Sequence, residues 1–262
     1  MILCEKIMKH ENTVDFWDDV AEDWEIQVGT DGDANRRLNS DPVLWQFAGD
    51  VNGLKVLDAG CGTGYLSGLL EKKGAVVTGV DFSEKMIRIA RKNNPEIDFD
   101  FDSCSELSSQ ANECFDLLIA NYVLMDVEDL ESAVNAFYRV LKPNGVAVLV
   151  FSHPCFPQAR RFTSQETGEL CYAWKNNYFE RVRCVDPPWN HFRSEFIWFH
   201  RSLSDYWRAF KSAGFAVIDF EEPRIKEDRY EFATNQKMLE SCTTRPFSVA
   251  FKLKKMKLNL FR

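Results

Sequence analysis

The chain has 262 residues, 45% of them hydrophobic, which is enough to bury the core of one large domain. Its formal charge of −8 disfavours a surface that follows nucleic-acid phosphates, because such surfaces are usually basic. No stretch approaches the roughly 18 apolar residues of a membrane span, and the N-terminus does not resemble a signal peptide. The eight cysteines are scattered without a CxxC pair, which predicts reduced thiols in a cytoplasmic protein and no metal site.

Two helices are expected before the core of the domain. Residues 13–27 carry an apolar stripe that includes Trp24, with acidic residues on the opposite face. A second helix begins at Asp41, which we interpret as its N-cap, with Pro42 in the first turn. The apolar stripe of the first helix is placed to cover a ligand pocket.

A glycine-rich turn follows the first expected strand. Residues 55–57 are the strand, and Gly60, Gly62 and Gly64 then alternate with other residues before a helix over 65–72. Glycines allow a sharp bend and a close approach of the backbone to a ligand. A second strand over 76–80 ends at Asp81, about 20 residues further on, as a βαβ unit that binds a ribose diol requires. The pattern predicts a nucleotide-type cofactor, which could be nicotinamide, flavin or S-adenosylmethionine.

The strand and helix alternation continues through the core. We expect a helix over 83–92 capped by Ser83, strands over 99–101, 115–120 and 146–151, and a helix over 130–141. A helix over 203–210 ended by Gly214, and strands over 215–220 and 247–253, complete the pattern. Strands separated by helices predict an α/β fold: a Rossmann-like, doubly wound, seven-stranded and mostly parallel sheet with helices on both faces.

Residues 152–200 interrupt this alternation. They contain many aromatic residues and show no sustained periodicity, so we interpret them as an insertion after the fifth strand, over the edge of the sheet where ligands bind. The aromatic surface is too large to be exposed to solvent. It predicts a lid with its own core, or a pocket for an aromatic or cationic acceptor.

The motifs together resemble the class I S-adenosylmethionine-dependent methyltransferases. The resemblance rests on residues 56–64, 80–83, 115–124 and 141–145. Residues 152–156 and the C-terminal stretch extend it over most of the chain, and the C-terminal stretch resembles the small-molecule methyltransferases of this group. The resemblance implies that the glycine turn holds the amino-acid part of the cofactor and that Asp81 binds the ribose. In such enzymes an Asp four residues before a Leu often receives the adenine amino group. Counting back from Leu107 gives Ser103 at that position, so Asp102 and Cys104 are named together with Ser103. The cofactor residues so expected are Trp24, Asp58, Gly60, Cys61, Gly62, Gly64, Asp81, Phe82, Asp102, Ser103, Cys104 and Asn121.

Methyl transfer requires positioning of the reactants and no protein nucleophile. A general base is needed only where the acceptor loses a proton, and histidine is a natural candidate. His153 follows the fifth strand at the ligand-binding edge, His191 and His200 flank the insertion, and Tyr178 is the leading hydroxyl within it. We name His153, Tyr178 and His200 as candidate catalytic residues; each could equally be an ordinary polar residue of the fold.

The sequence therefore predicts a single methyltransferase domain over 1–262. Its parts are cap helices (12–50), a cofactor-binding core (51–151), an acceptor-side lid (152–200) and a C-terminal helix with strands (201–262). We expect a monomer or homodimer that methylates an O, N or C atom of a small molecule, without a nucleic-acid or membrane partner. The alternatives are a catalytically silent S-adenosylmethionine-binding protein, an NAD(P)-dependent oxidoreductase, or a nucleic-acid or protein methyltransferase.

Overall fold

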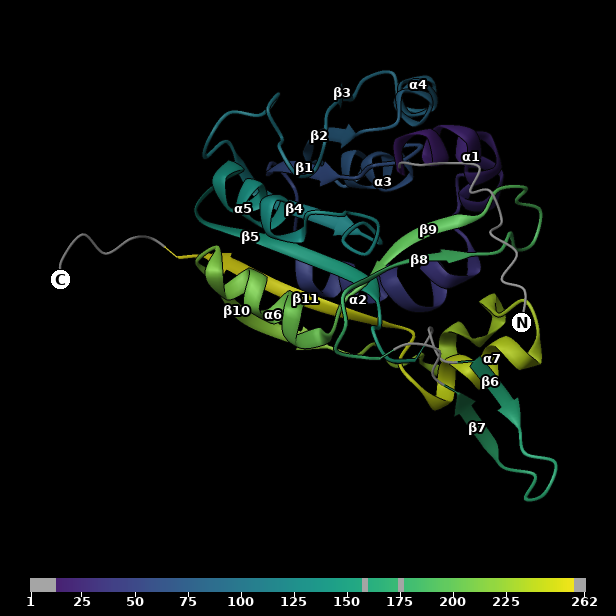
Figure 1. Ribbon diagram of the computed structural model, residues 1–262. Helices are drawn as coiled ribbons and strands as arrows, with labels where there is room; N and C mark the ends of the chain where they lie inside the picture. The colour runs from purple at the N-terminus through teal and green to yellow at the C-terminus, as the bar shows by residue number, and fades with distance from the viewer. Residues whose placement is uncertain (1–12, 157–159, 174–176, 257–262) are drawn as a thin grey trace.

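A seven-stranded sheet forms the centre of the computed structural model, which describes residues 13–156, 160–173 and 177–256 (Figure 1). The strand order is β10-β11-β5-β4-β1-β2-β3, and β11 runs antiparallel to both of its neighbours. The strands are β1 (Lys55–Ala59), β2 (Val76–Asp81), β3 (Asp98–Phe101), β4 (Phe115–Asn121), β5 (Leu141–Ser152), β10 (Phe215–Glu221) and β11 (Ser248–Lys255). The predicted Rossmann-like, mostly parallel sheet is confirmed.

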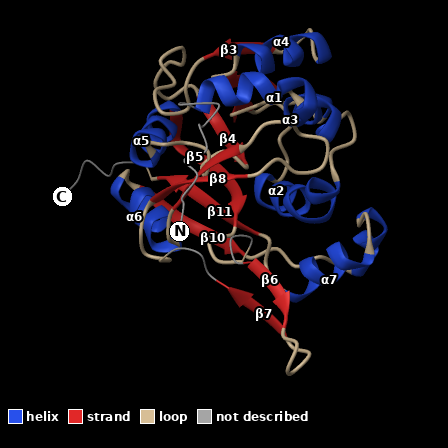
Figure 2. Cartoon of the chain, turned by 45° about the vertical axis from the view of Figure 1, so that its right-hand side comes forward, coloured by secondary structure: helices blue, strands red, loops and turns tan. Residues whose placement is uncertain are grey.

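Helices cover both faces of this sheet, as the blue ribbons around the red strands show (Figure 2). Helices α5 (Leu130–Val140) and α6 (Leu203–Ser212) contribute to one buried apolar cluster, and α2 (Asp41–Ala48), α3 (Tyr65–Lys72) and α4 (Glu84–Asn93) contribute to the other. In β1, Leu57 joins the first cluster and Val56 the second, because successive side chains of a strand point to opposite faces. Burial on both faces explains why the core strands are continuously apolar.

The order of the strands creates a crevice at their carboxyl ends. The chain moves outward from β1 to β2 and β3, and then returns to place β4 on the other side of β1. Ligands of open α/β sheets bind outside the carboxyl ends of the strands at such a switch point. The glycine turn after β1 and residue Tyr122 after β4 both lie there, and Tyr122 adopts a left-handed backbone with φ 58°.

The predicted N-terminal helix is α1 (Thr13–Val28), but the interpretation of Asp41 as a helix cap is wrong. A π-helical turn over Arg36–Ser40 runs directly into α2, and Ser40, the residue before α2, already has helical dihedral angles. The Asp41 carboxylate instead accepts a hydrogen bond from the Tyr65 hydroxyl at 2.8 Å. A partner from α3, not the local backbone, therefore determines the role of Asp41.

Residues 152–200 contain two hairpins that were not predicted. Strand β6 (Arg160–Thr163) pairs with β7 (Leu170–Ala173), and β8 (Val182–Asp186) pairs with β9 (Phe196–His200). In Figure 1 the β8–β9 hairpin lies beside α1, whereas the β6–β7 hairpin projects away from the central sheet. Phe192 and Ile197 form a small core with Phe16 and Val20 of α1, so part of the aromatic surface is buried, as expected.

The remaining elements extend the C-terminal half. The 3₁₀ turn η2 (Glu227–Phe232) and helix α7 (Gln236–Thr244) were not predicted, whereas Ser83 caps α4 and accepts a hydrogen bond from the backbone N–H of Met86 as expected. Gly214 follows α6 with φ +99°. Among the described residues, no helix combines the length and apolar character needed to cross a membrane.

Candidate active site

Two cavities meet at the carboxyl edge of the sheet. The smaller, of about 420 Å³, lies over the glycine turn, and the larger, of about 900 Å³, lies between the N-terminal helices and the β8–β9 hairpin. Their linings have five residues in common: Trp17, Trp24, Arg36, Tyr122 and Asp126. The two cavities therefore adjoin each other at these five residues, which we call the shared wall.

The glycine turn forms the floor of the smaller cavity. Gly60 has φ +74°, and a Cβ at this position would collide with the side chain of Val123. Gly62 has φ +54° and packs beneath Trp24, whose indole nitrogen would lie 3.6 Å from an added Cβ. The turn thus uses glycine both for its backbone conformation and for close approach to neighbouring side chains.

Asp81 holds the turn and the start of α4 together. Its Oδ2 accepts a hydrogen bond from the Gly62 N–H at 2.9 Å, and its Oδ1 accepts one from the Ser83 N–H at 2.9 Å. Burial raises the pKa of Asp81 to about 6, while these backbone hydrogen bonds act in the opposite direction. The carboxylate lines the cavity and has further lone pairs available to accept hydrogen bonds from a ligand.

Asn121, at the end of β4, presents an unsatisfied acceptor beside the same cavity. Its Nδ2 donates to the Ser40 hydroxyl at 3.4 Å, whereas its buried Oδ1 has no hydrogen-bond partner among the described residues. Buried polar atoms are usually paired, and an unpaired one calls for an explanation. An ammonium or other donor of a bound ligand would satisfy this oxygen.

Most of the residues predicted for the cofactor gather around the smaller cavity. Nine of them line it: Trp24, Gly60, Cys61, Gly62, Asp81, Phe82, Ser103, Cys104 and Asn121.

The other three predicted residues are absent from this lining and support the residues around it. Asp58 is buried in β1, where it accepts a hydrogen bond from the Ser67 hydroxyl at 2.6 Å. Gly64 caps α3 in a left-handed conformation and packs against Ala90 of α4. The carboxylate of Asp102 accepts hydrogen bonds from the backbone N–H groups of Ser103 and Ser109, at 2.7 and 2.6 Å. It therefore stabilises its own loop, and Ser103 faces the cavity instead.

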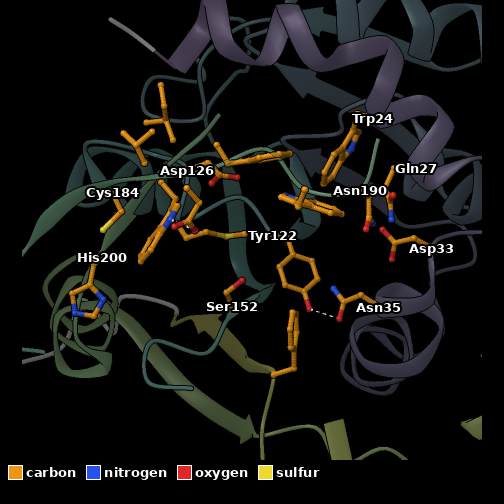
Figure 3. Close-up of a pocket in the computed structure, with 18 of the residues that line it drawn as sticks. Trp24, Gln27, Asp33, Asn35, Tyr122, Asp126, Ser152, Cys184, Asn190 and His200 are labelled. Atoms are coloured by element: carbon orange, nitrogen blue, oxygen red, sulfur yellow. Dashed lines mark hydrogen bonds between the residues drawn. The ribbon is translucent and has the colours of Figure 1, made fainter. Parts of the chain in front are cut away.

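Aromatic side chains dominate the wall of the larger cavity (Figure 3). They come from α1, from the turn after β4, from the segment before β8, from the β8–β9 hairpin and from the segment before β11: Trp17, Trp24, Tyr122, Tyr178, Trp189, Phe196, Trp198 and Phe247.

Two of the candidate catalytic residues, Tyr178 and His200, line this larger cavity. His200 Nε2 lies 2.9 Å from the Tyr178 carbonyl oxygen, which can only accept, so the proton of His200 is on Nε2. The Tyr178 hydroxyl accepts a hydrogen bond from the Leu203 N–H at 3.0 Å, and burial raises its pKa.

His153 lies outside the linings of both cavities. Its Nδ1 accepts a hydrogen bond from the Cys155 N–H at 3.1 Å, so Nε2 carries the proton and donates to Glu222 Oε1 at 2.8 Å. Burial lowers the pKa of His153, and Glu222 opposes this effect. The ring of His153 therefore fixes the end of β5, as expected for an ordinary polar residue of the fold.

His191 contacts the Asp23 carbonyl oxygen through Nε2 at 2.9 Å.

Three polar residues that were not predicted lie at the shared wall: Arg36, Tyr122 and Asp126. Arg36 is paired with Asp33 at 2.6 Å and lies 5.3 Å from the centre of the Trp24 ring, within cation–π range. The Tyr122 hydroxyl lies 3.1 Å from the Ser248 hydroxyl and 3.2 Å from Asn35 Oδ1. The polar stretch before α2 and the residues after β4 were visible in the sequence, but their meeting depends on the fold.

Comparison with known proteins relates this architecture to methyltransferases. A family model described as a methyltransferase domain matches residues 57–149, which span the glycine turn, Asp81 and β4. These residues therefore match a methyltransferase domain. An S-adenosylmethionine-dependent methyltransferase from Mesorhizobium loti has the same fold, with a TM-score of 0.70 at 23% identity over 86% of this chain and 100% of that one.

Two relatives of the chain carry methyltransferase names. A demethylmenaquinone methyltransferase of Chlorobaculum parvum is 38% identical over 105 residues, covering 40% of this chain and 42% of the relative. The mitochondrial ubiquinone biosynthesis O-methyltransferase of Mus musculus is 30% identical over 154 residues, covering 56% of this chain and 38% of the relative. The chain thus spans about two fifths of the length of these relatives.

The smaller cavity fits S-adenosylmethionine, the cofactor named for the structure that shares this fold. The glycine floor leaves room for close backbone approach, the buried Asp81 carboxylate suits the ribose hydroxyls, and the unpaired Asn121 Oδ1 suits the amino group of the methionine part.

Proposed function

We propose that this methyltransferase transfers a methyl group from S-adenosylmethionine to a hydroxyl group of a small aromatic acceptor. The observation that carries the proposal is the shared wall between a cavity fitted to the cofactor and a larger, aromatic-lined cavity. A methyl donor in the smaller cavity and an acceptor in the larger one would have to meet where the cavities adjoin, and holding them there in line is the main requirement of this reaction.

On the cofactor side, Asp81 would bind the ribose, Asn121 the methionine amino group, and Phe82 and Ser103 the adenine. The bound cofactor supplies an activated methyl group; the chain supplies its orientation. Trp24 would cover it, because this side chain lies over Gly62 and borders both cavities. We also infer that the cap helices (12–50) and the insertion (152–200) act with the core (51–151) as one catalytic domain, since all three line the larger cavity.

On the acceptor side, the aromatic wall supports a planar apolar acceptor, because stacked and edge-to-face ring contacts add to the free energy of burial. One named relative is a ubiquinone biosynthesis O-methyltransferase, which supports an oxygen atom as the methyl acceptor. Tyr178 and His200 would contact the acceptor from the far side of the cavity. His153 would hold the end of β5 and not take part in proton transfer.

A calorimetric titration with S-adenosylmethionine, S-adenosylhomocysteine and NADH, followed by incubation with catechols and aromatic amines, tests the proposal. We expect the first two ligands to bind and a methylated catechol to form. Preferential binding of NADH would favour the oxidoreductase alternative. Binding of the methyl donor without methylation of any catechol would overturn the proposed acceptor.

A further inference from the structure

Within the described part of the chain, Asp126 is the one carboxyl residue that lines both cavities. The residue follows β4 and is partly exposed, and it borders the smaller and the larger cavity. In the view of Figure 3, Asp126 and Tyr122 stand in the middle of the lining, with Trp24 and Asn35 on one side and Cys184 and His200 on the other. The described residues provide no hydrogen-bond donor to its carboxylate, unlike Asp81, which accepts two backbone hydrogen bonds. The Asp126 oxygens are thus available to ligands on both sides of the shared wall.

The loop that carries Asp126 is held firmly in place. The buried Arg201 side chain donates hydrogen bonds to the carbonyl oxygens of Leu124, Val127 and Glu128, at 3.3, 2.6 and 2.5 Å. The Phe199 N–H donates to the Met125 carbonyl oxygen at 2.7 Å, which ties the loop to β9. Backbone contacts on both sides of Asp126 therefore hold the backbone of this residue in place beside both cavities, as a group that takes part in chemistry requires.

The surroundings of Asp126 oppose its ionisation in the absence of a ligand. Burial raises the pKa of Asp126 well above its ordinary value; the Arg201 guanidinium lowers it and the Asp81 carboxylate raises it further. Tyr206 is buried beside Arg201. The other charged or titratable residues that line the cavities with Asp126 are Arg36 and Tyr122 in both, Cys61, Cys104, Glu128 and Asp129 in the smaller one, and Asp33, Tyr178, Arg183, Cys184, Asp186 and His200 in the larger one. A positive charge placed in the smaller cavity would favour the ionised carboxylate.

We propose that Asp126 is the proton acceptor of the methyl-transfer step, and that the positive charge of the cofactor sets its carboxyl group in the ionised form. The inference rests on the proposed function. It gives the carboxyl a role on each side of the wall: it faces the sulfonium charge in the smaller cavity and the acceptor's hydroxyl in the larger one.

The step balances in atoms and charge. The acceptor oxygen uses a lone pair to form a bond to the methyl carbon, and the carbon–sulfur bond breaks with its electron pair remaining on sulfur. The acceptor's O–H bond breaks with its electron pair remaining on oxygen, and the proton passes to the Asp126 carboxylate. A cation and an anion become two neutral groups, which is favourable in a site of low polarity. The proton then leaves Asp126 for solvent when the products depart.

Proton release on cofactor binding tests this proposal without an acceptor. S-Adenosylmethionine and S-adenosylhomocysteine differ in the methyl group and the sulfonium charge, so a difference in proton release between them reports the response to that charge. We would titrate both ligands by calorimetry between about pH 6 and 9, in buffers of different ionisation enthalpy. For the unmodified chain we expect S-adenosylmethionine to release up to about one proton more than S-adenosylhomocysteine, since the added cation lowers the pKa of a nearby carboxyl.

Three variants assign the proton. Asp126→Asn should abolish the difference and still bind S-adenosylhomocysteine, which shows that the variant is folded; Asp126→Glu should retain it. Asp219→Asn, an exposed Asp on the edge strand β10, is the matched control and should behave as the unmodified chain.

Equal proton release with the two ligands, or a difference that persists in Asp126→Asn, would overturn the proposal while leaving the proposed function intact. If neither ligand binds, the proposed function fails, and this inference fails with it.

Discussion

Replacement of Asp81 should weaken cofactor binding without unfolding the protein. Asp81→Ala removes a charged acceptor for the ribose hydroxyls, and hydrogen bonds to charged groups contribute about 1–3 kcal/mol each. It also removes the acceptor that holds the Gly62 and Ser83 N–H groups at 2.9 Å. We expect the Kd for S-adenosylhomocysteine to rise by about 5- to 150-fold. Asp81→Asn keeps the shape and one oxygen acceptor, so its effect should be smaller.

The pH dependence of binding makes the prediction sharper. Because burial raises the pKa of Asp81 to about 6, the carboxyl becomes protonated as the pH falls through this value and then accepts fewer hydrogen bonds. Calorimetry should show an affinity for S-adenosylhomocysteine that is constant above about pH 7 and falls below pH 6, and this fall should be absent in Asp81→Asn. Asp98→Asn, an exposed Asp at the opposite end of the neighbouring strand β3, is the control. A Kd unchanged within twofold in Asp81→Ala would refute the assignment.

Three further predictions concern stability. Gly60→Ala forces alanine into φ +74° against Val123, at about 1–2 kcal/mol for the backbone alone, so Tm in a thermal scan should fall by roughly 2–8 °C; an unchanged Tm would contradict the packing described. Asp58→Asn should stabilise the protein by up to about 3 kcal/mol at pH 8 and by little at pH 4. Burial raises the pKa of Asp58 from 3.8 to about 6. The contribution of Asp58 to the free energy of unfolding is therefore fully present below pH 3.8 and is lost as the pH rises through 6. Equal effects of the substitution at both pH values in urea unfolding would exclude this explanation. Arg201→Met leaves three carbonyl acceptors without their donor and should cost about 3 kcal/mol in urea unfolding, and a change below about 1 kcal/mol would show that the loop does not depend on Arg201.

The cofactor side of the site could be predicted because its chemistry is local in the sequence. Gly60 and Gly62 reveal the turn through their spacing, and Asp81 follows a strand that pairs with β1. On the adenine side the sequence pointed to Ser103, with Asp102 and Cys104 named beside it, and of these three Ser103 and Cys104 line the smaller cavity. Asp102 and Ser103 are adjacent, and only the hydrogen bonds from Ser103 and Ser109 determine that the Asp102 carboxylate turns toward its own loop.

The acceptor side could not be predicted because it depends on contacts between distant segments. Arg36 and Asp126 lie 90 positions apart in the sequence, and no spacing rule connects them. His153 follows β5 as expected, but the partner Glu222, after β10, holds its ring away from the cavities. Strand β8 includes Arg183 and Cys184 among its few residues, so its alternation of apolar and polar residues was too weak to identify it.

Methyl transfer itself is the central claim, and mass spectrometry of a reaction with methyl-deuterated S-adenosylmethionine and a set of catechols tests it most directly. We predict that a deuterated methyl group appears on a catechol oxygen, that S-adenosylhomocysteine accumulates in equal amount, and that Asp126→Asn slows the transfer more than it weakens S-adenosylhomocysteine binding. Tight binding of S-adenosylmethionine with no labelled product from any catechol would contradict the account and favour a protein that binds the cofactor without transferring its methyl group.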